Sequence, residues 1–253
     1  MPFNPISLLD RRYLITGAAS GLGKATSILL SKLGAELILV DINEKGLDET
    51  VALCSSKVNT LLVNLYDVSD IKKKILEAVS VYGKLNGFVH LAGRPYLSPL
   101  KSINEKTTTE VFILNTYAGV ELAKVCSSRN VYAGDKGSLI FISSVYGLVG
   151  SAANVGYALS KSALHGVTKS LAIELAPKNI RVNCIAPGFV KTKMLDDISN
   201  SFDSDYNETL NKLHPLGLGE ADDVANSVAF LLSDMSKWIT GSIMNVDGGF
   251  TAQ

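Results

Sequence analysis

Short apolar runs rich in β-branched residues alternate with longer segments of helical periodicity along the whole chain. Such alternation is typical of parallel strands joined by crossover helices. The expected strands are Tyr13–Thr16, Glu36–Asp41, Val58–Leu65, Gly87–Leu91, Ser138–Ser143, Ile180–Ala186 and Ser242–Val246. The expected helices are Gly21–Leu33, Glu44–Cys54, Ser69–Tyr82, Thr107–Ser127, Asn154–Ala176 and Ala221–Leu232. The pattern predicts an α/β fold, a doubly wound seven-stranded parallel sheet with helices on both faces.

No linker rich in Pro, Gly or Ser and no internal repeat divides the 253 residues, so we expect residues 1–253 to form a single domain. The 24 Lys and Arg residues balance 24 Asp and Glu residues, which argues against a nucleic-acid partner. The N-terminus lacks the pattern of a signal peptide, and the longest uncharged stretch, Ser138–Ser160, is interrupted by serines, glycines and Asn154. We therefore expect a cytoplasmic protein without a membrane segment.

The cysteines and histidines give no sign of a metal centre. Three cysteines, an odd number, are widely spaced and form no Cys-x-x-Cys pair, and the three histidines do not have the spacing of metal ligands; these residues are Cys54, Cys126, Cys184, His90, His165 and His214. Neither a disulfide framework nor a metal site is expected.

A glycine-rich segment, TGAASGLG, follows the first expected strand and opens the first expected helix. Gly17, Gly21 and Gly23 permit a tight turn, and their missing side chains let backbone N–H groups approach a pyrophosphate at the positive end of the helix dipole. Ser20 and Leu22 lie in the same turn. A lone glycine cluster is more often a simple turn, but the position between strand and helix favours a dinucleotide site.

Asp41 stands at the end of the second expected strand, in LILVDINEKG. A carboxylate there can accept hydrogen bonds from the ribose hydroxyls of NAD, whereas it would repel the 2′-phosphate of NADP. The nearest cations, Lys24 and Lys45, offer no clear compensation. The sequence therefore favours NAD over NADP, although a carboxylate at a helix N-terminus is the simpler alternative.

Tyr157 and Lys161 are spaced i, i+4 on an expected helix, so they share one face. An ammonium beside a phenol favours the phenolate, which lowers the phenol pKa and yields a usable acid or base. Tyr132 and Lys136 have the same spacing but lie in a glycine-containing loop, so we expect only surface positions for them.

Three further polar residues accompany the Tyr157–Lys161 pair. Ser143 and Ser144 end an expected strand, and because side chains alternate, only one of them should face a cleft. The spacing to Tyr157 does not decide between them. Asn115 lies inside an otherwise apolar helix, where a satisfied buried amide is the simpler interpretation.

Together these features resemble the short-chain dehydrogenase/reductase superfamily, closest to the branch that contains 3-oxoacyl-carrier-protein reductases and NAD-dependent alcohol or sugar dehydrogenases. The resemblance extends from Arg12 to the closing ITGSIMNVDGGF and includes RVNCIAPGFVKTKM. It implies a single-domain Rossmann fold and a catalytic tetrad of Asn115, Ser144, Tyr157 and Lys161. Tyr157 would exchange a proton with the substrate oxygen, and Ser144, selected over Ser143, would orient that oxygen. Lys161 would lower the tyrosine pKa and hold the nicotinamide ribose, and Asn115 would bind a water of a proton relay.

The resemblance also implies further cofactor contacts. Asp67 and Val68 match the neighbourhood of the adenine, and Pro187, Gly188, Val190 and Thr192 match a segment along the nicotinamide. The sequence HLAG keeps Ala92 and Gly93 where the family usually has Asn-Asn-Ala-Gly, but His90 and Leu91 replace the two amides. Local hydrogen bonds near the cofactor must therefore be rearranged or lost.

The substrate site is expected where loops leave the strands. Arg94, Tyr96, Tyr146, Leu148 and Phe189 are candidates to shape it, and we expect Arg94 either to anchor an anionic group or to lie at the surface. The long connection at 191–213 is the candidate lid, and its acidic part, Asp196–Leu210, carries no basic residue. His165 lies two helical turns from Tyr157, too far for a direct hydrogen bond, and is expected to pack in the core or an interface.

We therefore expect an NAD(H)-dependent oxidoreductase that transfers hydride between the nicotinamide and a secondary alcohol or ketone, with a hydroxyacyl, sugar or small-alcohol substrate. One alternative is an NADP-dependent 3-oxoacyl-carrier-protein reductase, which Asp41 and the acidic lid disfavour. The other is a non-catalytic dinucleotide-binding sensor or scaffold, which the tetrad disfavours and the His90–Leu91 replacement keeps open. The apolar helices at 107–127 and 154–176 resemble the family's dimer interface, which implies a homotetramer or homodimer.

Overall fold

The computed structural model describes residues 4–195 and 209–253. Their strands form one sheet in the order β3-β2-β1-β4-β5-β6-β7, and every neighbouring pair is parallel. The strands are β1 (Arg12–Thr16), β2 (Glu36–Asp41), β3 (Val58–Leu62), β4 (Gly87–His90), β5 (Gly137–Ile142), β6 (Ile180–Pro187) and β7 (Ile243–Val246). The predicted seven-stranded parallel sheet is confirmed.

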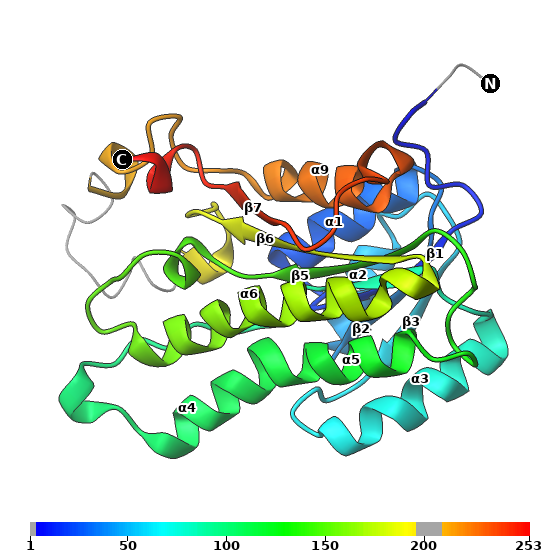
Figure 1. Ribbon diagram of the computed structural model, residues 1–253, viewed down its shortest axis with the longest axis horizontal. Coiled ribbons are helices and arrows are strands. Elements are labelled where there is room, and N and C mark those ends of the chain that lie inside the picture. The colour runs from blue at the N-terminus through cyan, green and yellow to red at the C-terminus, as the bar shows by residue number, and fades with distance from the viewer. Residues whose placement is uncertain (1–3, 196–208) are drawn as a thin grey trace.

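Helices cover both faces of this sheet (Figure 1). They are α1 (Gly21–Lys32), α2 (Glu44–Val51), α3 (Val68–Tyr82), α4 (Glu105–Phe112), α5 (Ala118–Cys126), α6 (Val155–Leu175) and α9 (Ala221–Leu232). Strand residues alternate between two buried apolar clusters: Leu14 packs with side chains of α3, α5 and α6, whereas Tyr13 and Ile15 pack with side chains of α1, α2 and α9. This alternation explains why the central strands are apolar throughout.

The order of the strands places a crevice at the carboxyl end of the sheet. β1 has β2 on one side and β4 on the other, so the winding of the chain reverses between β1 and β4. In open parallel sheets, ligands bind outside the carboxyl ends of the strands at such a switch point. The glycine-rich turn follows β1, and the loops after β4, β5 and β6 open toward the same crevice.

Two differences between the expected and observed elements bear on the cavity. β3 ends at Leu62 instead of Leu65, which leaves residues 63–67 as a loop. The expected helix Thr107–Ser127 is divided into α4 and α5 by a π-helical turn at Ile113–Tyr117, which contains Asn115. Single π turns inside α-helices often occur at functional sites. No helix in the described ranges is long and apolar enough to cross a membrane.

Candidate active site

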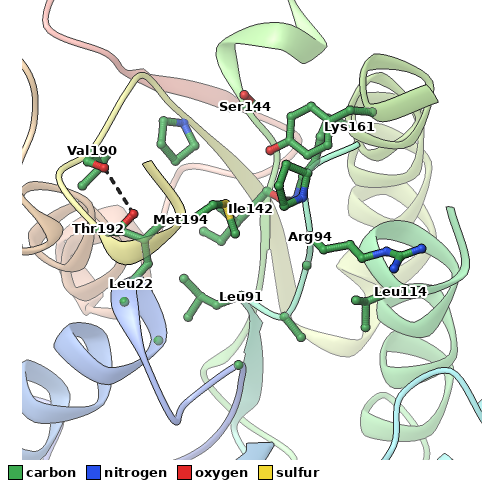
Figure 2. A pocket seen from close by; sticks show the side chains of 18 of the residues that line it. Leu22, Leu91, Arg94, Leu114, Ile142, Ser144, Lys161, Val190, Thr192 and Met194 are labelled. Carbon is green, nitrogen blue, oxygen red and sulfur yellow. Dashed lines mark hydrogen bonds between the residues drawn. The ribbon is translucent and has the colours of Figure 1, made fainter. Parts of the chain in front are cut away.

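A cavity of about 710 Å³ occupies the crevice, and it brings together most of the residues predicted from the sequence. Those that line it are Gly17, Ser20, Gly21, Leu22, Gly23, Asp41, Ala92, Gly93, Arg94, Ser144, Tyr146, Tyr157, Lys161, Pro187, Gly188, Phe189, Val190 and Thr192. Figure 2 shows how Leu22, Leu91, Ser144, Lys161 and Thr192 surround it.

The glycine-rich turn forms one end of the cavity. Gly17 and Gly21 have positive φ angles of 68° and 50°, which glycine adopts without strain. A Cβ on Gly17 would lie 2.8 Å from the backbone nitrogen of Ala92, and one on Gly23 only 2.0 Å from the carbonyl oxygen of Gly17. The turn can therefore pack this closely only with glycine at these positions.

The first turn of α1 is available to an anion. Ser20 precedes the helix, its side chain makes no capping hydrogen bond, and no acidic residue lies in the first turn. The helix dipole and the free N–H groups at such a terminus favour a phosphate. This local geometry fits the pyrophosphate of a dinucleotide.

Asp41, the last residue of β2, presents its carboxylate beside this turn. One oxygen accepts hydrogen bonds from the backbone N–H groups of Ile42 (2.8 Å) and Asn43 (3.0 Å), and the other accepts one from Ala19 N–H (3.1 Å). Three backbone donors therefore hold the carboxylate in place at the wall of the cavity. Lys24, one of the two nearest cations in the sequence, forms an ion pair with Glu49 at 3.3 Å.

The cavity continues past Asp41 along a loop that the sequence did not single out. Val63, Asn64, Leu65 and Tyr66 line this end, whereas Asp67 and Val68 are not among the lining residues. Asp67 precedes α3 and accepts a hydrogen bond from the Ser69 hydroxyl at 2.6 Å. β3 ends at Leu62, so the residues after it form a loop that reaches the cavity. The sequence pattern did not show this, because Val58–Leu65 was expected to be one continuous strand.

Tyr157, Lys161 and Ser144, three residues of the predicted tetrad, line the cavity together. Tyr157 and Lys161 lie one turn apart on α6, and Lys161 Nζ is 5.8 Å from the centre of the Tyr157 ring. Ser144 follows β5, and its side chain lies close enough to the Tyr157 hydroxyl to lower that group's pKa. The neighbouring Ser143 is buried and donates to the Lys161 carbonyl at 2.9 Å, so Ser144 is the serine that faces Tyr157.

The pKa of Tyr157 differs in direction from the sequence expectation. Burial raises the pKa of Tyr157 to about 12, and the neighbouring Ser144 side chain acts against this rise. Burial lowers the pKa of Lys161 to about 8. Desolvation therefore dominates the pKa values of both groups.

Asn115 lies in the π turn and is completely buried. Its Oδ1 accepts from Arg94 N–H (2.9 Å), and its Nδ2 donates to the Arg94 carbonyl and the Ser160 hydroxyl (both 3.0 Å). The amide thus ties the segment after β4 to α6. A Cβ on Gly93 would lie 3.0 Å from Asn115 Oδ1 and 3.5 Å from Lys161 Nζ, so both groups lie close to Gly93.

The segment after β6 forms the opposite wall. Pro187, Gly188, Val190 and Thr192 all line the cavity, and the Thr192 hydroxyl donates to the Val190 carbonyl at 3.3 Å (Figure 2). The Thr192 methyl lies 3.8 Å from where a Cβ of Gly21 would be. This wall therefore approaches the glycine-rich turn across the cavity.

The substrate candidates divide into two groups. Tyr146 and Phe189 line the cavity with their rings edge-to-face, 5.6 Å apart. Tyr96 and Leu148 do not line it, and the Tyr96 hydroxyl accepts a hydrogen bond from Asn104 N–H instead.

Arg94 lines the cavity, but its guanidinium already has partners. It pairs with Glu110 at 3.0 Å and lies over the Tyr66 ring. Figure 2 shows its side chain extending away from Ser144 toward the helix that carries Leu114. The geometry therefore offers no free charge from Arg94 to an anionic substrate.

The predicted lid is described only at its two ends. Lys193, Met194 and Leu195 line the cavity, and residues 196–208, with most of the acidic segment, lie outside the described residues. His165 donates from Nε2 to the Ser143 hydroxyl at 2.9 Å, so it supports the end of β5. Within the described ranges, no group of three or more His, Cys, Asp or Glu residues could hold a metal ion.

Comparison with known proteins decides the family. A family model described as enoyl-(acyl carrier protein) reductase matches residues 17–251. The chain is a short-chain dehydrogenase/reductase. Short-chain dehydrogenase/reductases bind a nicotinamide dinucleotide and act on alcohol or ketone groups, so the chain is an oxidoreductase of that type.

Three related short-chain dehydrogenase/reductases illustrate the range of the family. A 3-oxoacyl-[acyl-carrier-protein] reductase of Thermotoga maritima is 35% identical over 240 residues, which are 93% of this chain and 96% of the relative. A cyclohexanol dehydrogenase of an Acinetobacter species is 34% identical over 250 residues, 95% of this chain and 94% of the relative. The crystal structure of an Agrobacterium tumefaciens protein described as a 2-deoxy-D-gluconate 3-dehydrogenase, with bound NADP, has a TM-score of 0.90 at 29% identity and covers 99% of this chain and 100% of its own.

Proposed function

We propose that this protein is an NAD(H)-dependent dehydrogenase that interconverts a neutral secondary alcohol and its ketone. One observation carries the proposal: Tyr157, Ser144 and Lys161 line the same cavity as the glycine-rich turn and Asp41. Proton transfer and dinucleotide binding thus have their groups in one continuous space. We also propose that residues 1–253 act as one dinucleotide-binding domain, because one sheet includes all the described strands.

In the oxidising direction, Tyr157 accepts the hydroxyl proton of the alcohol while hydride leaves the carbon that carries this hydroxyl. When bound, the nicotinamide takes up that hydride, and in the reverse direction it supplies one. Ser144 donates a hydrogen bond to the substrate oxygen and keeps it beside Tyr157. In ketone reduction Tyr157 gives its proton back, and the high pKa of its phenol keeps that proton in place until the oxygen becomes basic.

Lys161 and Asn115 support this exchange. Lys161 is buried at the base of Tyr157, where its amine can hold a ribose hydroxyl and stabilise the phenolate once a ligand brings further polar groups. Asn115 keeps the segment after β4 against α6 and, like Lys161, lies close to Gly93.

The proposed preference for NAD rests on Asp41. Its carboxylate is fixed by three backbone N–H groups, and among the described lining residues the basic ones are Arg94, Lys161 and Lys193. Arg94 is paired with Glu110, and Lys161 lies beside Tyr157. A 2′-phosphate beside Asp41 would therefore meet a negative charge.

The bound NADP of the Agrobacterium protein is the observation that favours the other cofactor. The ratio of kcat/KM with NAD to that with NADP separates the two. We expect NAD to be preferred, and Asp41→Ala to shift the ratio toward NADP by at least about 10-fold, since a like charge is removed. Asp48→Ala, an exposed acid on α2, is the matched control and should leave the ratio unchanged. A wild-type preference for NADP would overturn the cofactor assignment.

The proposed substrate class follows from the side chains that line the cavity together with Tyr157 and Ser144. Tyr146, Phe189, Val145 and Leu97 line it, and the charge of Arg94 is compensated by Glu110. Apolar and aromatic walls with a few polar groups at the reacting oxygen suit an uncharged ring or alkyl alcohol. The similarity to a cyclohexanol dehydrogenase supports the same class.

The second candidate is a 3-oxoacyl-carrier-protein reductase, favoured by the similarity to the Thermotoga enzyme. Initial rates from the absorbance of reduced nicotinamide, with cyclic secondary alcohols and ketones on one side and 3-oxoacyl thioesters on the other, separate the two functions. Tyr157→Phe should reduce the rate with the active class by about 10² to 10⁴. Undiminished turnover in this variant would overturn the assigned mechanism.

We further propose that the enzyme is a cytoplasmic homodimer or homotetramer that associates through α5 and α6. Val155, Leu159 and Ile173 on α6, and Tyr117 beside it, expose apolar side chains. Val155 and Leu159 are four residues apart and so share a face. Leu159→Glu should reduce the molar mass measured by light scattering, and an unchanged mass would exclude this face.

A further inference from the structure

His90 occupies the place where the family usually has the first of two asparagines, and its side chain is 1% exposed. It is the last residue of β4 and pairs in register with Thr16, the last residue of β1. The imidazole joins two elements: Nδ1 lies 2.9 Å from the Thr16 hydroxyl, and Nε2 lies 3.0 Å from the carbonyl oxygen of Leu114. The hydrogen bonds at this position are thus rearranged, not lost.

Donor and acceptor roles at this imidazole follow from its partners. A carbonyl oxygen only accepts, so Nε2 carries the proton. Burial and the nearby Lys161 lower the pKa of His90 to about 4, which keeps the ring neutral and leaves Nδ1 as an acceptor. The Thr16 hydroxyl must therefore donate its hydrogen to Nδ1. Its oxygen is then free to accept.

The Thr16 hydroxyl connects His90 to the backbone that forms one wall of the dinucleotide cavity. It accepts hydrogen bonds from the backbone N–H groups of Leu91 and Ala92, both at 3.1 Å. This backbone packs directly against Gly17 of the glycine-rich turn. The first arm of His90 is its hydrogen bond through Nδ1 to Thr16. This bond therefore determines where the chain that leaves β4 lies relative to the glycine-rich turn.

The second arm of His90 is its hydrogen bond through Nε2 to the Leu114 carbonyl, in the π turn that carries Asn115. The N–H of Ala118 donates to Ile113, five residues back, and the Leu114 carbonyl, the usual partner four residues back, accepts from His90. The imidazole thus satisfies a carbonyl that the wider turn would leave unpaired in the interior. The next residue along the chain from Leu114 is Asn115.

Packing around the ring agrees with this arrangement. A Cβ on Gly119 would lie 2.9 Å from His90 Cδ2 and 2.9 Å from the Phe141 ring. The absence of a side chain at Gly119 therefore makes room for the imidazole between α5 and the sheet.

We propose that His90 is a positioning residue with two separable actions: through Thr16 it sets the dinucleotide wall, and through Leu114 it sets the turn that carries Asn115. The second action rests on the proposed catalytic role of Asn115. The first rests only on dinucleotide binding.

Two amide substitutions separate the two arms. In His90→Asn, the amide oxygen falls near the position of Nδ1 and can accept from Thr16, but nothing reaches Leu114. In His90→Gln, the longer side chain places its amide nitrogen near the position of Nε2 and can donate to Leu114, while the bond with Thr16 is lost. Binding of NADH, followed by its fluorescence, reports the first arm, and kcat at saturating cofactor and substrate reports the second.

His90→Asn should reduce kcat by about 5- to 30-fold and leave the Kd for NADH within about 2-fold. His90→Gln should raise this Kd by about 5- to 30-fold and leave kcat within about 2-fold. Equal effects of the two variants on both quantities, or no effect of either, would overturn the proposal. Ser138→Ala is the matched control and should change neither quantity. Ser138 lies near the start of β5, at the end of the sheet away from the cavity, and the substitution removes its buried hydrogen bond to the Leu231 carbonyl of α9.

Two further measurements keep the proposal independent of turnover and of how well the variants fold. In the wild-type protein, the ¹⁵N shifts of the His90 ring should show a protonated Nε2 and a bare Nδ1, and the opposite tautomer would overturn the proposal. Amide exchange at Ala118 and Gly119 should accelerate in His90→Asn but not in His90→Gln. Wild-type protein that binds NADH but turns over no substrate would refute the proposed dehydrogenase function, while the NADH affinities and the exchange rates would still decide the role of His90.

Discussion

Lys161 Nζ lies 2.8 Å from the carbonyl oxygen of Ile142, the last residue of β5, and donates a hydrogen bond to it. This bond holds the Lys161 amine of α6 against the end of β5, just before Ser143 and Ser144. The amine is buried, and burial lowers its pKa to about 8 from the ordinary 10.5. Folding therefore keeps an amine in a place that disfavours its charge.

This burial predicts a pH dependence of stability. Because the pKa is lower in the folded protein, the unfolded chain binds more protons between about pH 8 and about pH 10.5, and the free energy of unfolding rises with pH across this window. Lys161→Met removes the titrating group, so wild type should gain stability relative to the variant as pH rises. Urea unfolding of both proteins at the two ends of the window measures the change, and a constant difference would contradict the burial of the amine.

Gly119 and Gly166 provide a matched pair of helix glycines. A Cβ on Gly119 would meet His90 and Phe141 at 2.9 Å, whereas one on Gly166 of α6 would meet nothing within 4 Å. Gly119→Ala should therefore destabilise the fold by about 1–3 kcal/mol through overpacking. Gly166→Ala should stabilise it by about 0.5–1 kcal/mol, because alanine has the higher helix propensity. Equal effects in urea unfolding would mean that the space around Gly119 can expand.

Much of the fold and most of the cavity lining could be predicted because their signals are local. Hydrophobic periodicity located all seven strands, and the position of the glycines between strand and helix indicated the dinucleotide turn. The resemblance, not the spacing, selected Ser144 over Ser143. The structure provides the physical reason, since Ser143 is occupied by Lys161 and His165.

The remaining features depend on tertiary contacts that no local pattern encodes. The π turn at Asn115 lies inside a continuous apolar helical pattern. Its Leu114 carbonyl is paired by His90, which comes from β4 and is distant in the sequence. Arg94 gave no sign of its partner Glu110, which lies on a different element. The pKa of Tyr157 was expected to fall because the sequence shows the neighbouring charge but not the extent of burial.

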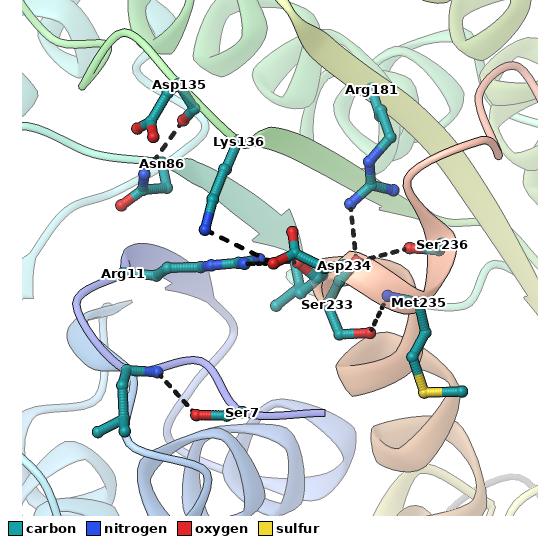
Figure 3. A network of polar contacts seen from close by, with 12 residues as sticks. Ser7, Arg11, Asn86, Asp135, Lys136, Arg181, Ser233, Asp234, Met235 and Ser236 are labelled. Carbon is teal, nitrogen blue, oxygen red and sulfur yellow. Dashed lines mark hydrogen bonds and ion pairs between the residues drawn. The ribbon is translucent and has the colours of Figure 1, made fainter. Parts of the chain in front are cut away.

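The end of α9 is held by basic residues at the amino ends of β1, β5 and β6, opposite the cavity at the carboxyl ends of the strands (Figure 3). Arg11 is 5% exposed, donates to the Leu232 carbonyl at 3.0 Å and pairs with Asp234 at 2.6 Å. Lys136 also approaches Asp234, at 3.5 Å, and Arg181 donates to the Ser233 carbonyl at 3.4 Å. A buried cation thus satisfies helix carbonyls, where the helix dipole favours positive charge.

This arrangement predicts unequal effects of the two partners of the ion pair. Arg11→Ala should destabilise the fold by about 2–4 kcal/mol, because it leaves a cavity and leaves the buried Leu232 carbonyl with only the longer side-chain hydrogen bond, from the Tyr13 hydroxyl at 3.3 Å. Asp234→Ala should cost at most about 1 kcal/mol, since the carboxylate is largely exposed and Arg11 keeps its bond to Leu232. Urea unfolding of both variants checks the order, and a larger loss for Asp234→Ala would reverse this interpretation.

The hydrogen bond from Arg11 lowers the pKa of Asp234 below the ordinary 3.8. Because the folded pKa is the lower one, the stabilising contribution of this carboxylate is present above about pH 3.8 and is lost as the pH falls through the folded value. The difference in stability between wild type and Asp234→Ala should therefore shrink in acid. A difference that does not change with pH would mean that the ion pair adds nothing.

Phe250, close to the C-terminus, packs against Tyr146 and Phe189, the two aromatic residues that line the cavity. Its ring centre lies 6.3 Å from Tyr146, 6.1 Å from Phe189 and 4.9 Å from His214, and it does not itself line the cavity. Asp247 holds this segment by accepting hydrogen bonds from the N–H and the hydroxyl of Thr251. Phe250→Ala should let Tyr146 and Phe189 shift, because each loses an aromatic partner worth about 0.5–1.5 kcal/mol.

The expected consequence is confined to the substrate. KM for an apolar ketone should rise by about 2- to 15-fold, as such a loss implies, while the Kd for NADH stays unchanged, because the dinucleotide end of the cavity lies at the glycine-rich turn. Leu216→Ala, which truncates an exposed neighbour on the same surface, serves as the control and should alter neither quantity. Steady-state kinetics with a series of ketones of increasing ring size would show the largest loss for the largest ring, since a loosened aromatic wall gives up most contact with the substrate that fills it. A uniform loss across the series, or weaker NADH binding, would place Phe250 in the general stability of the fold and not in substrate selection.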